Sequence, residues 1–215
     1  MALNSNALTT TAAVKAYLGI SVSTYDTFFE TQINVYSNLI EKYCNRVFGT
    51  ATYTDELYKG YNTATLQLRN YPVTVLTTIE LNDSELSTDD YELIRGVGLT
   101  NTGKIHKNTI WWANGTRSNI SENLDYKDYN IKVTYTAGYV LPASVDPVPN
   151  LPSEISQACI DMVAYRLSTR NTIQGIKSEK LITGSITYGD NQVSSKSGLL
   201  PSVEGYLSAY KRVVL

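Results

Sequence analysis

The chain has 215 residues, of which 42% are hydrophobic and 18% are charged, and its net charge at pH 7 is -2. This length suits one large domain or two small ones, and the charge balance offers no basic field to bind nucleic acid through its phosphates. No apolar run approaches the roughly 20 residues of a membrane span, and the first residues lack the blocks of a signal peptide. We therefore expect a soluble protein, made in the cytoplasm, with no membrane partner.

Tyrosine dominates the aromatic residues, with 17 copies against three Phe and two Trp. Tyrosine is enriched at partly hydrated protein interfaces, but with Thr and Val it also marks β-strands, so the composition leaves both interpretations open. The two cysteines, Cys44 and Cys159, lie far apart in helix-like segments. Two cysteines are too few for a disulfide framework, and we expect both to be buried as small apolar residues.

The first predicted element is a short helix. The segment TTTAAVKAYLGI, which begins at Thr9, has apolar residues at helical spacing and stops at Gly19, a residue that commonly ends helices. The apolar residues at helical spacing are Val14, Tyr17 and Leu18.

A longer amphipathic helix is predicted to follow, from a cap at Ser23 or Thr24 to a stop at Gly49. Lys42 and Arg46 near its end would complement the helix dipole. Its predicted inner face consists of apolar residues three or four positions apart: Phe29, Ile33, Tyr36, Ile40, Tyr43 and Val47.

Apolar residues alternate with polar ones between about residues 50 and 136, which predicts antiparallel strands. The clearest alternation lies in residues 64–69, 73–81 and 131–136. Turns are predicted where Gly, Asn, Asp and Pro gather, at residues 59–60, 70–72, 82–84, 96–98, 101–103 and 114–115.

The C-terminal part begins with a proline-rich linker over residues 142–152. A second core helix is predicted from Pro152 to about Ser168, with Ile155, Cys159, Met162, Val163 and Arg166 at helical spacing. A hairpin or loop is expected within residues 175–198. The last predicted helix carries Val203, Tyr206, Leu207 and Tyr210 on one side, and the apolar residues Val213–Leu215 follow it.

These elements predict an α+β fold, in which N- and C-terminal segments form a small helical bundle around an inserted antiparallel β subdomain. We expect a helical domain made of residues 1–48 and 150–215. Residues 49–149 would form the β-rich insertion with its proline-rich linker.

Residue patterns typical of catalysis are weak. His106 is the single histidine, and a metal site or a Ser-His relay would need partners that the sequence hardly supplies. Carboxylates such as Asp89, Asp90 and Glu92 lack the spacing of a calcium loop, and no Gly-rich phosphate loop joins a strand to a helix. We expect no enzyme activity, metal or cofactor.

Several motifs together resemble the head-tail connector (adaptor) proteins of tailed bacteriophages. A Thr-rich cap precedes VKAYL, and the following helix has the pattern I-x-x-S-x-x-I-E-x-Y-C-x-R-x-F. YPV at residues 71–73, VTYTAGY at 133–139 and LPSEISQACIDMVAYRL at 151–167 continue the order. A looser match comprises Lys177, Ser178, Glu179, Gly184 and Tyr188. The long β insertion departs from the short, nearly all-helical members of this family.

The resemblance implies a structural virion protein at the head-tail junction, made in the host cytoplasm. Such proteins form a ring, commonly of twelve copies, between the portal protein and the stopper or tail-completion protein. The ring surrounds the channel for DNA packaging and ejection, without sequence-specific DNA binding. By analogy, we expect contacts with the portal or a neighbouring copy at Tyr188, Tyr206, Tyr210, Lys211 and Arg212.

Two alternatives from other classes remain at this stage. A tail-completion or tail-terminator protein would be mainly β, which the long predicted helix disfavours. A carbohydrate-binding protein would need an exposed aromatic surface on the insertion, for which Trp111 and Trp112 are candidates. Adjacent strand residues point to opposite faces, so at most one of the two would line it.

Overall fold

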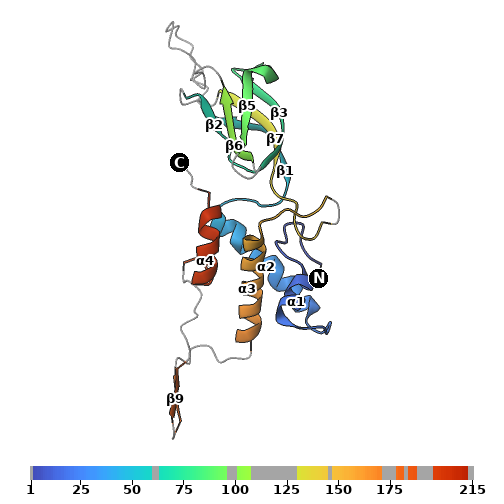
Figure 1. Ribbon diagram of the computed structural model, residues 1–215, viewed down its shortest axis with the longest axis vertical. Coiled ribbons are helices and arrows are strands. Elements are labelled where there is room, and N and C mark those ends of the chain that lie inside the picture. Colours follow the sequence, from blue (N-terminus) through green and yellow to red (C-terminus); the bar gives the residue numbers. More distant parts are fainter. Residues whose placement is uncertain are drawn as a thin grey trace. The chain divides into compact units, whose positions relative to one another are not determined.

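The computed structural model describes residues 2–59, 63–95, 101–107, 130–144, 147–170, 178–181, 184–187 and 196–212. The chain divides into two compact units, Met1–Gly49 with Val140–Leu215, and Thr50–Tyr139. The α-helices and a short antiparallel hairpin within residues 178–187 belong to the first unit, and the two larger antiparallel sheets belong to the second, so the predicted α+β class is confirmed (Figure 1). In the described ranges, every helix is too short or too polar to cross a bilayer.

The helical unit contains α1 (Thr11–Leu18), α2 (Asp26–Cys44), α3 (Ser153–Thr169) and α4 (Pro201–Leu207), and the 3-10 helix η2 (Ser208–Tyr210) follows α4 directly. α2 packs against α3, and α3 lies between α1 and α4 (Figure 1). The helices predicted around residues 9–19, 152–168 and 201–210 are thus present. Segments far apart in the chain close one core, because each amphipathic helix must bury its apolar side.

α1 has the predicted ends. The hydroxyl of Thr10 accepts a hydrogen bond from the Ala13 amide at 3.2 Å, which satisfies a first-turn donor. Gly19 adopts a left-handed conformation with φ 66°, where a side chain is disfavoured. Of the three apolar residues at helical spacing, Val14 is fully buried, whereas the side chain of Tyr17 is 56% exposed.

Both predicted ends of α2 were wrong. The helix begins at Asp26, and Tyr25 precedes it without a side-chain cap, so neither Ser23 nor Thr24 plays that role. It ends at Cys44 because Asn45 adopts a left-handed conformation with φ 52°, which Asn tolerates better than most residues. Val47 therefore lies beyond the helix and is 48% exposed. The buried residues of α2 are Phe29, Ile33, Asn34, Ser37, Ile40 and Cys44.

α3 supplies the centre of the helical core. Pro152 immediately precedes its first residue, as suits a residue that lacks an amide donor. Its buried residues are Ile155, Ala158, Cys159, Ile160, Met162 and Val163. Cys44 and Cys159 are both free and fully buried, which confirms the expectation for the cysteines.

Alkaline pH is expected to destabilise the helical unit through these thiols. Burial raises the pKa of Cys159 from 9.0 to about 12 and that of Cys44 to about 11. The unfolded chain therefore loses these protons first, and stability present below about pH 9 is lost as the pH rises toward the folded pKa values, by at most about 1.4 kcal/mol per pH unit and thiol. Urea unfolding at pH 8 and pH 10.5 measures the loss.

The Cys159→Ala variant provides the comparison for this pH dependence. It removes the titrating group, so the loss of unfolding free energy between the two pH values should be smaller than in the wild type. An equal loss in both proteins would contradict the assignment to Cys159.

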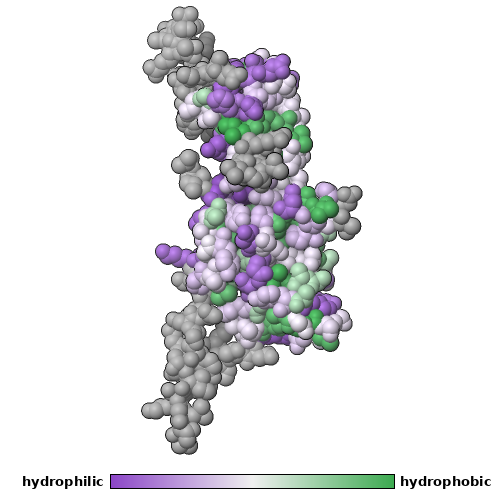
Figure 2. Space-filling view, in the orientation of Figure 1, coloured by the Kyte–Doolittle hydropathy of each residue, from purple (hydrophilic) through white to green (hydrophobic). Residues whose placement is uncertain are grey.

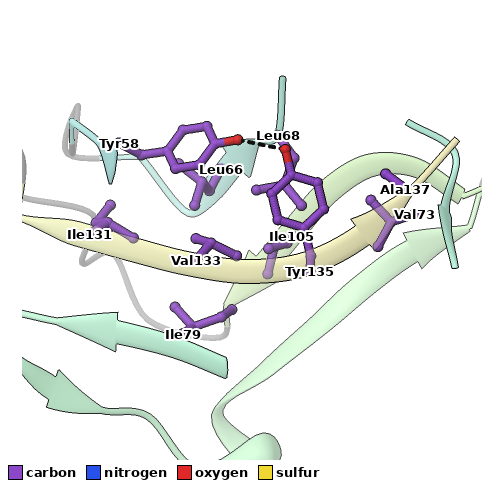
Figure 3. Packing of buried hydrophobic residues seen from close by; sticks show 10 residues of the cluster. All are labelled: Tyr58, Leu66, Leu68, Val73, Ile79, Ile105, Ile131, Val133, Tyr135 and Ala137. Carbon is purple, nitrogen blue, oxygen red and sulfur yellow. Dashed lines mark hydrogen bonds between the residues drawn. The ribbon is translucent and has the colours of Figure 1, made fainter. Parts of the chain in front are cut away.

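The β unit contains two antiparallel sheets. The larger sheet has the order β1 (Ala51–Tyr58), β7 (Ile131–Ala137), β3 (Val73–Leu81) and β4 (Ser84–Glu85). The smaller sheet has the order β2 (Thr65–Gln67), β6 (Asn101–Lys107) and β5 (Tyr91–Arg95), and the 3-10 helix η1 (Thr88–Asp90) precedes β5. Residues from both sheets form one core (Figure 3), comprising Tyr58, Leu66, Leu68, Val73, Ile79, Ile105, Ile131, Val133, Tyr135 and Ala137.

The alternation of β7 explains its central place in the larger sheet. Every second residue of this strand is buried, and it pairs with β1 on one side and β3 on the other. The strands predicted at residues 64–69, 73–81 and 131–136 are confirmed. The turn predicted at 82–84 is confirmed too, since Asn82 and Asp83 have φ values of 53° and 61°, typical of a tight hairpin.

The turn predicted at residues 101–103 was wrong, because these residues begin β6. Asn101 pairs with Arg95 of β5, and pairing on both sides, with β2 and β5, begins only at Lys104. The register shifts at residues 102–103, as is typical of a β-bulge. Gly103 makes the strand possible with φ 72° and accepts a hydrogen bond from the Leu68 amide at 2.7 Å. The turns predicted at 96–98 and 114–115 lie outside the described residues.

A separate hairpin occurs within the predicted segment 175–198. β8 (Ser178–Leu181) pairs antiparallel with β9 (Gly184–Thr187), in the register from Ser178 opposite Thr187 to Leu181 opposite Gly184. The predicted hairpin is therefore confirmed for these eight residues.

Candidate assembly surface

The C-terminal segment is built into the helical core. Leu199, Val203 and Leu207 are buried, and the Leu200 amide lies 3.4 Å from the Met162 sulfur on α3. Pro201 occupies the first turn of α4, where its fixed φ angle and missing donor suit a helix start. α4 consequently stabilises the core as well as presenting an outer surface.

The end of this segment is attached to the ends of α2 and α3. The Arg212 amide donates to the Cys44 carbonyl at 2.8 Å, one of the carbonyls that a helix end leaves without an intrahelical partner. The ammonium group of Lys211 lies 4.7 Å from the ring centroid of Tyr43, within cation-π range. These contacts fix the path of the chain up to Arg212.

The structure brings three of the five predicted contact residues together. Tyr210 donates from its hydroxyl to a Glu154 carboxylate oxygen at 3.4 Å, and Lys211 and Arg212 follow it against α2. Tyr206 lies on α4, where it is 46% exposed while its neighbour Leu207 is buried. The prediction that both face one side of the helix was wrong. Tyr188 and the apolar residues 213–215 lie outside the described residues.

A second cluster was not predicted from the sequence. Asp161 on α3 accepts a hydrogen bond from the Gln157 side chain at 2.7 Å. The Asp161 carboxylate also raises the pKa of Tyr17, through its charge and as a hydrogen-bond acceptor, and Tyr206 adds to this increase. We call Tyr17, Asp161 and Tyr206 the tyrosine-aspartate patch. Its members come from α1, α3 and α4, so the spacing of residues in the sequence could not predict that they belong to one cluster.

The outer face of the helical unit is mixed in character. In the view of Figure 2, hydrophobic and hydrophilic residues are interspersed over this unit. The surfaces of proteins that associate reversibly have a similar polarity to the rest of the surface, with aromatic residues enriched at their centre. The exposed rings of Tyr17 and Tyr206 are consistent with such a surface.

Groups typical of metal or acid-base chemistry are dispersed in the described ranges. These ranges hold no set of three or more His, Cys, Asp or Glu side chains placed to bind a metal ion. His106 lies in β6, opposite Thr65 and Glu92 in the paired strands. Trp111 and Trp112, the candidates for a sugar-binding surface, lie outside the described residues.

Comparison with known proteins gives a family and a similar fold. The sequence matches a family described as head completion protein over residues 7–179. A chain from the neck of an empty GTA particle, computed with C6 symmetry, has a similar fold, with a TM-score of 0.53 and 13% identity over 100% of this chain and 94% of that chain. No curated protein matches the sequence.

A chain from the neck of a native GTA particle, computed with C12 symmetry, gives a TM-score of 0.48 and 12% identity, again over 100% of this chain and 94% of that chain.

The ends of the matched range show which elements of the structure the family includes. It begins before α1, continues past the β unit through α3 and ends at residue 179, so the β unit falls within the matched range although the sequence suggested that it departs from the family. α4 and the predicted contact residues lie beyond the match. Since the match covers most of the 215 residues, the chain belongs to the head completion protein family and is a structural virion protein of the bacteriophage head-tail connector type.

Proposed function

We propose that this protein is a head-tail adaptor that forms a ring under the portal protein, extends the DNA channel and provides the attachment site for the stopper or tail. The observation that carries the proposal is the family match over residues 7–179. The attachment of the C-terminal segment to α2 and α3 adds a structural reason, because it holds a cluster of polar and aromatic side chains at a defined place.

The two units are proposed to have separate roles. Residues 1–48 and 150–215 would be the connector domain, and residues 49–149 an inserted domain that faces other virion components. Along the chain, the second compact unit begins at Thr50, within one residue of the proposed limit, and ends at Tyr139, ten residues before it. An insertion with its own core can be stable while its termini join a second domain.

A ring needs two different surfaces on each copy, since every copy contacts its neighbours head to tail. The similar GTA neck chain occurs in a particle computed with C6 symmetry, which is compatible with such a ring. We propose twelve copies for this protein, on the basis of its resemblance to connector proteins.

The channel role agrees with the charge of the chain. A net charge of -2 provides little attraction for DNA phosphates, and binding through phosphates would slow a sliding duplex. DNA is therefore proposed to pass without sequence-specific contacts.

We propose that Tyr206, Tyr210, Lys211 and Arg212 contact the portal or a neighbouring copy, together with Tyr188. Lys211 is exposed and Arg212 is partly buried, so both cations can gain partners on assembly. Tyr rings are suited to an interface that keeps some water.

Sedimentation velocity tests this function with the purified chain alone and mixed with the portal protein encoded beside it. We expect a complex with about one copy per portal subunit. The double variant Lys211→Glu, Arg212→Glu should weaken this complex about tenfold or more, because it reverses two charges at the proposed contact.

The matched control is Lys104→Glu, which reverses an exposed charge on β6 in the β unit and should bind as the wild type does. A folded wild-type chain that forms no complex with the portal would contradict the adaptor function. Binding unaffected by the double variant would contradict only the role of Lys211 and Arg212.

A further inference from the structure

The strand β1 lies at the end of the larger sheet. Among the described strands, it pairs with β7 and with no other. An edge of this kind presents main-chain amides and carbonyls to which a strand of another chain can add. The way in which these groups are covered therefore decides whether two copies can associate through their sheets.

A bulge interrupts this edge at its middle. The register of β1 with β7 shifts between Tyr53 and Glu56, and Asp55 between them has a left-handed φ of 51°. The Asp55 amide donates to the Thr134 side chain on β7 at 3.1 Å, so it does not face the open side of the strand. The bulge bends β1 and divides it into two short paired stretches, Ala51–Tyr53 and Glu56–Tyr58.

Arg69 covers the second of these stretches. Its guanidinium donates to the main-chain carbonyl of Leu57 at 2.9 Å and lies 3.1 Å from a Glu56 carboxylate oxygen. Because β7 occupies the other side of β1, the guanidinium reaches the Leu57 carbonyl from the open side. A strand that approached this edge would have to displace it.

Several contacts hold Arg69 in this position, although 42% of its side chain is exposed. The carbon of the guanidinium lies 4.6 Å from the ring centroid of Tyr58, within cation-π range. The main-chain amide of Arg69 donates to the Tyr58 hydroxyl at 3.0 Å, which fixes the start of the side chain. A planar guanidinium is suited to binding Leu57 and Glu56 at once, so the side chain is well placed to cover the edge.

We propose that Arg69 closes the β1 edge to strand addition, and that the strand it excludes is β1 of a second copy. Two identical strands can pair antiparallel about a two-fold axis, because each then offers the other the same donors and acceptors. The Leu57 side chain, which is 43% exposed, would add apolar area to such a pair. A pair of this kind is isologous and would compete with the head-to-tail contacts of a ring. Arg69 thus restricts the association of copies to other surfaces.

Arg69→Ala tests this proposal in the full chain. Hydrogen exchange measured by mass spectrometry follows the β1 amides at two protein concentrations about fiftyfold apart, which reveals association by mass action. In Arg69→Ala, β1 peptides should exchange at least about fivefold more slowly at the higher concentration, because pairing protects the amides on the open side. Wild-type β1 peptides should exchange at one rate, whether or not the chain forms rings. Sedimentation velocity should show a dimer of Arg69→Ala that the wild type does not form.

Lys132→Ala is the matched control. It removes one positive charge from the same sheet, and the Lys132 side chain is 36% exposed. Lys132 lies on the central strand β7, where it pairs with Glu80 and Asp83, so its β1 peptides should exchange independently of concentration. Arg69→Lys keeps a cation that can bind Leu57 or Glu56 but is poorly shaped to bind both, and it should show a smaller protection than Arg69→Ala.

The outcomes concern the β1 edge separately from the adaptor function. Protection of β1 at high concentration in Arg69→Ala, absent from the wild type and from Lys132→Ala, supports the proposal. A folded Arg69→Ala chain with equal exchange at both concentrations overturns it, as does a wild-type chain whose β1 is already protected by association. If far-UV circular dichroism shows that Arg69→Ala is unfolded, Arg69→Lys decides by the same criterion. Binding to the portal protein is measured independently, so failure of either proposal leaves the other standing.

Discussion

Replacing Glu56 with alanine is expected to lower the free energy of unfolding of the β unit by about 2 to 3 kcal/mol. Glu56 lies on the edge strand β1, and its carboxylate accepts hydrogen bonds from the hydroxyls of Tyr58 and Tyr135. Arg69 lies 3.1 Å from the other carboxylate oxygen. The substitution therefore removes one acceptor shared by two buried hydroxyls and a guanidinium.

The position of the two tyrosines makes this loss costly. Both are buried in the core shown in Figure 3, and their hydroxyl oxygens lie 3.1 Å apart. After substitution, one hydroxyl can donate to the other, but the second has no comparable acceptor, at a cost of about 1 to 3 kcal/mol. The exposed ion pair with Arg69 adds only about 0.5 kcal/mol.

Burial and the Glu56 carboxylate also hold the pKa of Tyr135 at about 12 and that of Tyr58 well above its usual value. Both groups thus remain protonated hydrogen-bond donors across the physiological range.

Hydrogen exchange measured by mass spectrometry tests this prediction in the full chain. Peptides from β7 should lose protection in Glu56→Ala, while peptides from α3 serve as an internal reference. Glu80→Ala is the matched control, because Glu80 lies in the same sheet and pairs with Lys132 at 3.2 Å on the surface. We call Glu56, Tyr58, Arg69, Asn70 and Tyr135 the Glu56 cluster. Equal effects of the two substitutions would contradict a special role for this cluster.

The sequence predicted the elements of the fold better than their boundaries. The alternation in β3 and β7 and the helical spacing in α3 reflect burial of one face, which the residue pattern states directly. The end of α2 was missed because Asn45 adopts the left-handed conformation, and a Gly four residues later is the stronger local signal. Residues 101–103 begin β6 instead of forming a turn: Asn101 pairs with β5, and the register shifts at residues 102–103.

Clusters of side chains were much less predictable. The Glu56 cluster joins β1, β7 and residues 69–70, and the tyrosine-aspartate patch joins α1, α3 and α4. Local patterns contain no information on which distant segments meet. A tyrosine in an amphipathic pattern is compatible with either the core or the surface. Tyr58 on β1 is buried, whereas Tyr17 on α1 is exposed.

The connector-like pattern of α2 has a structural explanation. Ile33, Ser37, Ile40, Cys44 and Phe48 in this pattern are all buried. Its acidic residue, Glu41, is the residue whose role the spacing did not explain. One carboxylate oxygen accepts the Phe48 amide at 3.0 Å, and the other accepts the Asn6 side chain at 2.8 Å. Glu41 thus connects α2 with the turn after it and with the segment before α1, residues 2–10, which we call the N-terminal arm.

Replacing Glu41 with alanine is expected to lower the free energy of unfolding of the helical unit by about 2 kcal/mol, because the partly buried amide of Phe48 loses its acceptor and the N-terminal arm loses a contact. Urea unfolding followed by helical circular dichroism measures the change. Glu41→Gln retains one carbonyl acceptor and should show an intermediate loss.

Glu154→Ala is the control for this prediction, since the Glu154 contacts with Tyr210 and Ser153 are long and exposed. Its expected loss is below about 1 kcal/mol. If Glu41→Ala were no more destabilising than this control, Glu41 would not stabilise the fold, and its role would lie in contacts made on assembly. Measurements on the isolated chain thus distinguish a residue that stabilises the fold from a residue that contacts a partner, because only the first affects unfolding before any partner is present.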